Sequence, residues 1–216
     1  KRKLTSSNYD TIVSVDRPHY CYGATEACGG SNGWCYTFQR RQANGQLNNK
    51  AAMVDVVAQK FPQIFVEKVV KEVHSLVSCG LLPYPNLRYS GSGEVALGHI
   101  LALKMLCENG IHLWGFSRSI KVGIALRSIG AKVIISCDHT TRKDLIETAK
   151  YENFPLAYTS IDVTDFPPEG TVVTFPIHRG GNVAEVVDVD SLCPKVVEEY
   201  FRGQRRPNAC QSLCSR

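Results

Sequence analysis

The loop from Ser90 to Glu94 is the segment of this sequence best suited to hold a small ligand. Its two glycines have no side chains, so a ligand could approach the backbone N–H groups closely. Apolar residues then recur at helical spacing over residues 95–108, and the N-terminus of a helix attracts a carboxylate or phosphate. A second strand, predicted over residues 111–116, ends beside a serine. We therefore predict a cofactor site at Ser90, Gly91, Ser92, Gly93, Glu94 and Ser117. The alternative is a glycine loop that only makes a tight turn.

Two aspartates follow the next predicted strands and are the candidate catalytic residues. Asp138 ends the strand predicted over 132–137, and Asp162 ends the strand predicted over 156–163. At the carboxyl end of a strand, a carboxylate can orient a substrate amine or hydroxyl, or act as a base. The alternative for Asp138 is that it, or Thr140, caps the helix predicted over 142–151.

A group of cysteines near the N-terminus suggests a metal site. Four potential ligands, enough for tetrahedral zinc, are His19, Cys21, Cys28 and Cys35. Glycines between them would let the chain wrap around a metal ion. The spacing is not that of a Cys-x-x-Cys pair, so buried or reactive thiols remain the alternative, and nothing near Cys35 fixes a base for nucleophilic catalysis.

Basic residues gather at both ends of the chain, which has a formal net charge of +5. Lys and Arg release counterions when they bind phosphates, so such ends favour RNA as a partner. The candidate RNA-binding residues are Lys1, Arg2, Lys3, Arg202, Arg205 and Arg206. A solubilising surface is the alternative.

The elements that would position these residues alternate along the chain. Apolar spacing over residues 50–80 predicts two helices separated at Pro62, and from residue 87 onward short strands alternate with helices of about ten residues. Parallel strands joined by right-handed crossovers have this pattern. We predict an α/β fold with a Rossmann-like, mainly parallel sheet over residues 51–216, preceded by a Cys- and Gly-rich β or irregular lobe over residues 1–50.

Residues 85–175 resemble the Rossmann-like S-adenosylmethionine-dependent methyltransferases, whose first strand runs into a Gly-rich loop. The resemblance implies S-adenosylmethionine as cofactor and methyl transfer as activity, with RNA as a possible substrate. Two departures stand out: Tyr89 or Ser90 replaces the acidic residue that often precedes the loop, and the second strand ends in Ser117 instead of an acidic residue. A degenerate, inactive member of the family is therefore an alternative.

Two other functions fit the same elements. Asp138 and the later Asp-Val-Thr-Asp of residues 162–165 resemble parts of a short-chain, NAD(P)-dependent oxidoreductase, but the loop at residues 117–119 lacks glycine and no Tyr-x-x-x-Lys follows. The third candidate is a non-catalytic domain that binds RNA or protein. The absence of an initiator Met favours a piece of a larger polyprotein, whose neighbouring domains would then be partners.

The composition limits the setting of the protein. Hydrophobic residues make up 44% and charged residues 21% of its 216 residues, as in ordinary globular proteins. No apolar run reaches the roughly 20 residues that cross a bilayer, so no transmembrane segment is predicted. Nine cysteines cannot all pair, and three lie in apolar segments (Cys79, Cys107 and Cys137), so we expect a soluble protein of the reducing cytoplasm. In an oxidising compartment Cys210 and Cys214 could pair.

Overall fold

The computed structural model describes residues 5–8, 12–14, 25, 45–90, 93–160 and 165–176. The chain divides into two compact units, the first made of Lys1–Gly23 and Cys35–Val133 and the second of Ala24–Trp34 and Ile134–Arg216. The boundary at residue 50 remains a prediction.

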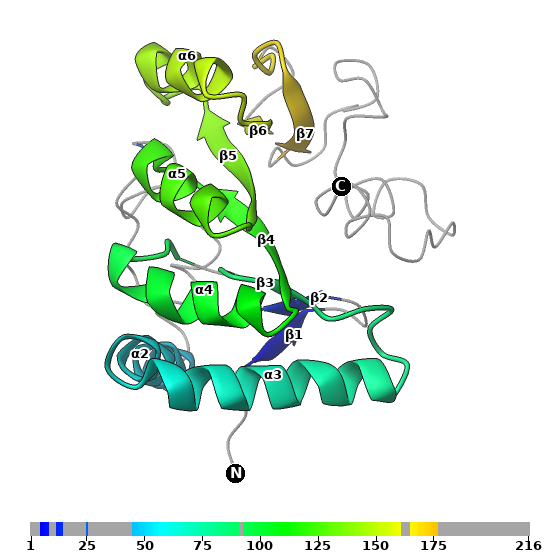
Figure 1. Ribbon diagram of the computed structural model, residues 1–216. Helices are drawn as coiled ribbons and strands as arrows, with labels where there is room; N and C mark the ends of the chain where they lie inside the picture. The colour runs from blue at the N-terminus through cyan, green and yellow to red at the C-terminus, as the bar shows by residue number, and fades with distance from the viewer. Residues whose placement is uncertain are drawn as a thin grey trace. The chain divides into compact units, whose positions relative to one another are not determined.

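The first unit contains a row of four strands in which the strand order follows the chain (Figure 1). A short antiparallel pair, β1 (Ser6–Asn8) and β2 (Ile12–Ser14), begins the row. Strand β2 then pairs in parallel with β3 (Asn86–Arg88), and β3 pairs in parallel with β4 (His112–Ser117). The parallel pairing predicted for the strands after residue 86 is thus confirmed in this unit.

Two long helices precede β3 in the chain. Helix α2 spans Gly45–Lys60, and α3 spans Pro62–Ser78 and buries an apolar stripe: Phe65, Val66, Val69 and Val73. Pro62 occupies the first turn of α3, where its missing N–H costs nothing because that position has no intrahelical partner. Gly80 has a positive φ of 70°, as expected of a glycine that ends a helix. The prediction of two helices separated at Pro62 is confirmed.

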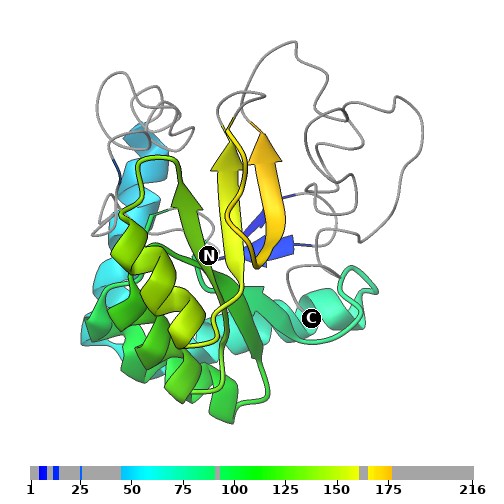
Figure 2. The same ribbon diagram turned by 90° about the horizontal axis from the view of Figure 1, so that it is seen from above.

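Helix α4 joins β3 to β4. A 3-10 turn, η1 (Leu97–His99), leads into α4 (Ile100–Glu108), and after β4 the chain enters α5 (Ile120–Ser128). Figures 1 and 2 show α4 and α5 on the same face of β3 and β4. Right-handed crossovers that always advance in one direction place their helices on one face in this way.

One expected boundary is wrong: the helix predicted to begin at Val95 begins only at Leu97. Ala96 is extended, with a ψ of 146°, and its N–H is bound by the side chain of His99. Residues 93–96 are therefore part of the loop. The loop that contains Glu94 is thus longer than the apolar spacing predicts.

The two faces of β3 and β4 differ. Leu87, Tyr89 and Leu113 are all buried, and strand alternation and register put them on one face. The ring of Tyr89 packs directly on Gly115, where an added Cβ would lie 2.9 Å from two ring carbons. Only glycine leaves space for this ring.

The second unit has three parallel strands, again in chain order. They are β5 (Lys132–Asp138), whose first two residues belong to the first unit, β6 (Leu156–Ser160) and β7 (Thr171–Pro176). Helix α6 (Lys143–Tyr151) connects β5 to β6. Every residue of β6 is buried, as expected for an inner parallel strand.

Both units have parallel strands with connecting helices, so the predicted α/β class with a mainly parallel sheet is confirmed. Of the β or irregular N-terminal lobe, only residues 5–8, 12–14, 25 and 45–50 are described. Among the described residues, no helix has both the length and the apolar character needed to span a bilayer.

The cysteine environments differ from one another. Cys137 is buried and its thiol donates to the carbonyl of Ala157, at 3.5 Å. Cys107 is half-buried, and burial raises the pKa of its thiol, with the charge of Glu108 adding to the shift. Cys79, expected inside an apolar segment, is exposed at the end of α3, because this position follows the last buried turn of the helix.

Candidate functional site

In the first unit, the carboxylate of Glu94 contacts the carboxyl end of β4 from the loop that follows β3. Glu94 is 4% exposed and lies in the loop between β3 and η1. Its Oε2 accepts hydrogen bonds from the backbone N–H of Arg118 (2.8 Å) and the hydroxyl of Ser117 (3.2 Å), while Oε1 accepts from the N–H of Val95 (3.0 Å). The side chain therefore ties the loop after β3 to the carboxyl end of β4.

The surroundings of Glu94 disfavour its charged form. Burial raises the pKa of this carboxyl above its ordinary value of 4.5, and the hydrogen bonds from Arg118, Val95 and Ser117 oppose the shift. A carboxylate has about four acceptor positions, and the three donors among the described residues leave one for a ligand. Glu94 can thus accept from an amine or hydroxyl, or donate once it is protonated.

The glycine loop itself is held by a local bond. The hydroxyl of Ser90 donates to the carbonyl of Gly93 at 2.5 Å, and Gly93 has a positive φ of 75° that a residue with a Cβ would adopt only under strain. Four predicted cofactor residues are described, and the structure brings Glu94 to Ser117 and Ser90 to Gly93. Gly91 and Ser92 lie outside the described residues.

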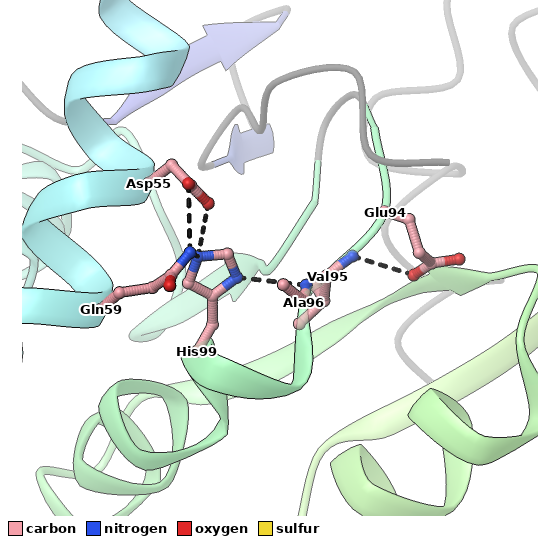
Figure 3. Close-up of polar contacts among 6 residues, drawn as sticks. All are labelled: Asp55, Gln59, Glu94, Val95, Ala96 and His99. Atoms are coloured by element: carbon pink, nitrogen blue, oxygen red, sulfur yellow. Dashed lines mark hydrogen bonds and ion pairs between the residues drawn. The ribbon is translucent and has the colours of Figure 1, made fainter. Parts of the chain in front are cut away.

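Three polar side chains, those of Asp55, Gln59 and His99, lie close together next to the loop (Figure 3), and His99 holds the end of the loop at Ala96. Nδ1 of His99 accepts from the N–H of Ala96 at 3.2 Å, which assigns the ring hydrogen to Nε2. Nε2 lies 2.6 Å from Oδ1 of Asp55, and Gln59 donates to the other carboxylate oxygen at 3.1 Å. His99 is fully buried. Both ring nitrogens face protein groups, so His99 is suited to positioning the loop and not to proton transfer.

Sequence reasoning does not single out this group. It places Asp55, Gln59 and His99 only within segments whose apolar spacing predicts helices. One signal is present, because two polar residues four apart on a helix share one face. The side chain that meets them comes 40 residues later, as the Gln59–His99 separation shows.

In the second unit, Asp138 is buried at the carboxyl end of β5, being 1% exposed. Its Oδ1 accepts from the backbone N–H of Thr140 (2.9 Å) and from the Thr140 hydroxyl (2.7 Å). Its Oδ2 accepts from the hydroxyl of Thr25 at 2.5 Å. Asp138 therefore holds Thr25 at this strand end.

The capping role considered for Asp138 or Thr140 is wrong. The residue before α6 is Arg142, and no side chain accepts a hydrogen bond there; Arg142 instead forms an exposed pair with Asp144. Asp138 turns its carboxylate to the loop before the helix, because Thr140 and Thr141 bind it locally.

The second predicted catalytic residue, Asp162, lies outside the described residues. Its neighbour Asp165 accepts a hydrogen bond from the hydroxyl of Tyr158, and the carbonyl of Asp165 accepts from Ser160 at 3.2 Å. Burial first, and then the Asp165 carboxylate, raise the pKa of Tyr158. These contacts hold Asp165 beside β6.

With this geometry in place, the chain can be compared with known proteins. Family models, curated proteins and solved structures give no match. Function must therefore be argued from the site.

The metal and RNA predictions fall on other parts of the chain. His19, Cys21, Cys28 and Cys35 lie outside the described residues, as do Lys1, Arg2, Lys3, Arg202, Arg205 and Arg206. Within the described ranges, no three His, Cys, Asp or Glu side chains are grouped so as to hold a metal ion.

Proposed function

We propose that this chain binds S-adenosylmethionine at the carboxyl ends of β3 and β4, as a methyltransferase-like domain. The observation that supports the proposal is the buried Glu94 carboxylate, hydrogen-bonded to Ser117 and to the N–H of Arg118. Ligands of parallel α/β proteins bind at this end of the strands. Glu94 follows the glycines instead of preceding them, and its remaining acceptor position would receive a ribose hydroxyl of the cofactor.

The proposal also includes a metal held by His19, Cys21, Cys28 and Cys35. Support comes from Thr25, which lies between Cys21 and Cys28 in the sequence and donates to Asp138 at the end of β5. Thr25 is thereby held at a strand end where ligands of this fold class bind. Zinc is the predicted ion, and thiolates also hold iron–sulfur clusters.

Isothermal titration with S-adenosylmethionine, NADH and a short RNA tests the cofactor. We expect S-adenosylmethionine to bind, and the Ser117→Ala variant to bind it more weakly because Glu94 loses one of the groups that orient it. Ser128→Ala, which changes an exposed serine of α5, is the matched control. Binding of NADH alone would favour the oxidoreductase, and binding of RNA alone would favour the non-catalytic domain.

Elemental analysis of the purified protein tests the metal. About one equivalent of zinc is expected, with loss of N-terminal order on chelation. Iron together with acid-labile sulfide would indicate an iron–sulfur cluster on the same thiolates instead of zinc. A folded preparation free of both metals would overturn the proposed metal site.

A further inference from the structure

The face of β3 and β4 opposite to that of Leu87 and Leu113 carries a set of polar groups. Parallel pairing aligns Asn86 with His112 and Arg88 with Trp114, so these side chains share one face. The guanidinium carbon of Arg88 lies 5.7 Å from the ring centroid of Trp114 and 5.0 Å from that of Phe116. Cation–π contacts of this length hold the guanidinium over the aromatic rings.

Among the described residues, three polar atoms on this face are buried and have no hydrogen-bond partner. They are the Oδ1 of Asn86, the Nε of Arg88 and the Nε1 of Trp114. Asn86 is 1% exposed and Trp114 is 2% exposed. The amide nitrogen of Asn86 donates to the carbonyl of Tyr84 at 3.1 Å, which orients Oδ1 as the acceptor that remains. A buried polar atom left unsatisfied costs about 1–3 kcal/mol, so three on one face point to a ligand that satisfies them.

The chemistry of the three atoms defines the ligand. Arg88 and Trp114 supply two N–H donors beside a positive charge, which suits an anionic oxygen group. Asn86 supplies an acceptor, which suits an ammonium. We infer that Asn86, Arg88 and Trp114 bind the α-amino-acid end of a small ligand, with the carboxylate on Arg88 and Trp114 and the ammonium on Asn86. The identity of that ligand as S-adenosylmethionine rests on the proposed function, while the amino-acid site itself does not.

Tryptophan fluorescence gives a direct test, because the chain has only two tryptophans, Trp34 and Trp114. In a Trp34→Phe background, Trp114 is the sole indole. Titrating the full chain with S-adenosylmethionine should change its emission. Arg88→Gln should then weaken binding of S-adenosylmethionine by 10-fold or more but leave 5′-methylthioadenosine, which lacks the amino-acid end, unaffected. Arg127→Gln makes the same charge change on α5 and should leave both affinities unaltered, and circular dichroism checks that every variant is folded.

The outcomes separate the two proposals. If S-adenosylmethionine binds and Arg88→Gln has no effect on its affinity, the amino-acid site is overturned and the cofactor proposal stands. If the parent protein does not bind S-adenosylmethionine, the cofactor proposal fails. Titrations with L-methionine and with inorganic phosphate then test the amino-acid site. A response to L-methionine that Arg88→Gln abolishes supports it. No response, or a response to phosphate alone, overturns it.

Discussion

The hydroxyl of Ser117 lies 3.2 Å from Oε2 of Glu94, across a separation of 23 residues. The same oxygen also accepts from the backbone N–H of Arg118. The glycine loop and the end of the next strand, each predicted from the sequence to hold a ligand, are thus joined directly by Glu94 and Ser117. The loop after β3 cannot move away from β4 without breaking these bonds.

Glu94→Gln should change how stability depends on pH. Burial raises the pKa of Glu94 in the folded protein, so between its ordinary value of 4.5 and the folded value the native state holds a proton that the unfolded chain has lost. Stability contributed by this group is therefore full below 4.5 and declines as pH rises through the folded pKa. Urea denaturation from pH 4 to 8 should show this decline in the parent protein and not in Glu94→Gln.

The matched control for this prediction is Glu67→Gln, which changes an exposed glutamate of α3. It should retain the decline seen in the parent protein. A decline of equal size in Glu94→Gln would show that another group causes it.

Asp55→Ala should destabilise the first unit strongly. It removes the oxygen nearest to the ring N–H of the buried His99, and a buried donor left unsatisfied costs about 1–3 kcal/mol. It also removes the acceptor of the Gln59 amide, which belongs to an exposed residue, so water can replace that bond. We expect a loss of about 1–3 kcal/mol in the free energy of unfolding, measured by urea denaturation, and a smaller loss for Asp55→Asn, which keeps one carbonyl oxygen.

Asp144→Ala provides the comparison, because it breaks an exposed pair with Arg142 that water can replace. It should alter stability little. Equal effects of Asp55→Ala and Asp144→Ala would mean that the His99 group is not a stabilising contact.

Gly115→Ala should destabilise the protein through the Tyr89 ring. The new Cβ would lie 2.9 Å from two ring carbons, and overpacking of a rigid core costs about 1–3 kcal/mol. Thermal unfolding measures the loss. In the double variant Tyr89→Leu with Gly115→Ala, the ring is gone, so the loss should be smaller than the sum of the two single losses. Additive losses would contradict this contact.

RNA binding, if the basic ends provide it, should be electrostatic. Changing Arg205 and Arg206 to Ala should weaken all RNAs alike and reduce the salt dependence. For a single strand, the slope of log K against log salt should fall by about 0.7 for each phosphate that the variant no longer neutralises. Fluorescence anisotropy at several salt concentrations measures both effects. Absence of binding at low salt, or binding that survives removal of both ends, would leave the basic residues a solubilising role.

The sequence predicted the elements of the second half well, because turn residues and apolar spacing are local signals. Pro62 separates two helices as predicted, and strands β3 to β6 begin within one residue of their expected positions. The helix predicted to begin at Val95 begins instead at Leu97, because the side chain of His99 binds the N–H of Ala96. Apolar spacing carries no information about such a bond.

The site could be predicted only where its residues lie in the loop or at a strand end. Glu94 and Ser117 had such positions, so both were found. Asp55 and Arg88 act through partners on other elements, and their roles depend on packing and strand register that one sequence does not display. Their types alone, an acid on a helix and an arginine on a strand, are equally typical of solvated surfaces.

The order of the strands also bears on how the chain assembles. Within each unit every parallel strand pairs with its predecessor along the sequence, so β3 with β4, and β5 with β6, need only one intervening helix before they can form. Pairings of short sequence separation form fast and can begin during synthesis on the ribosome. The bond from Thr25 to Asp138 is the opposite case, because it spans 113 residues. Thr25 must therefore wait for β5 to emerge before this bond can form, so it closes late in folding.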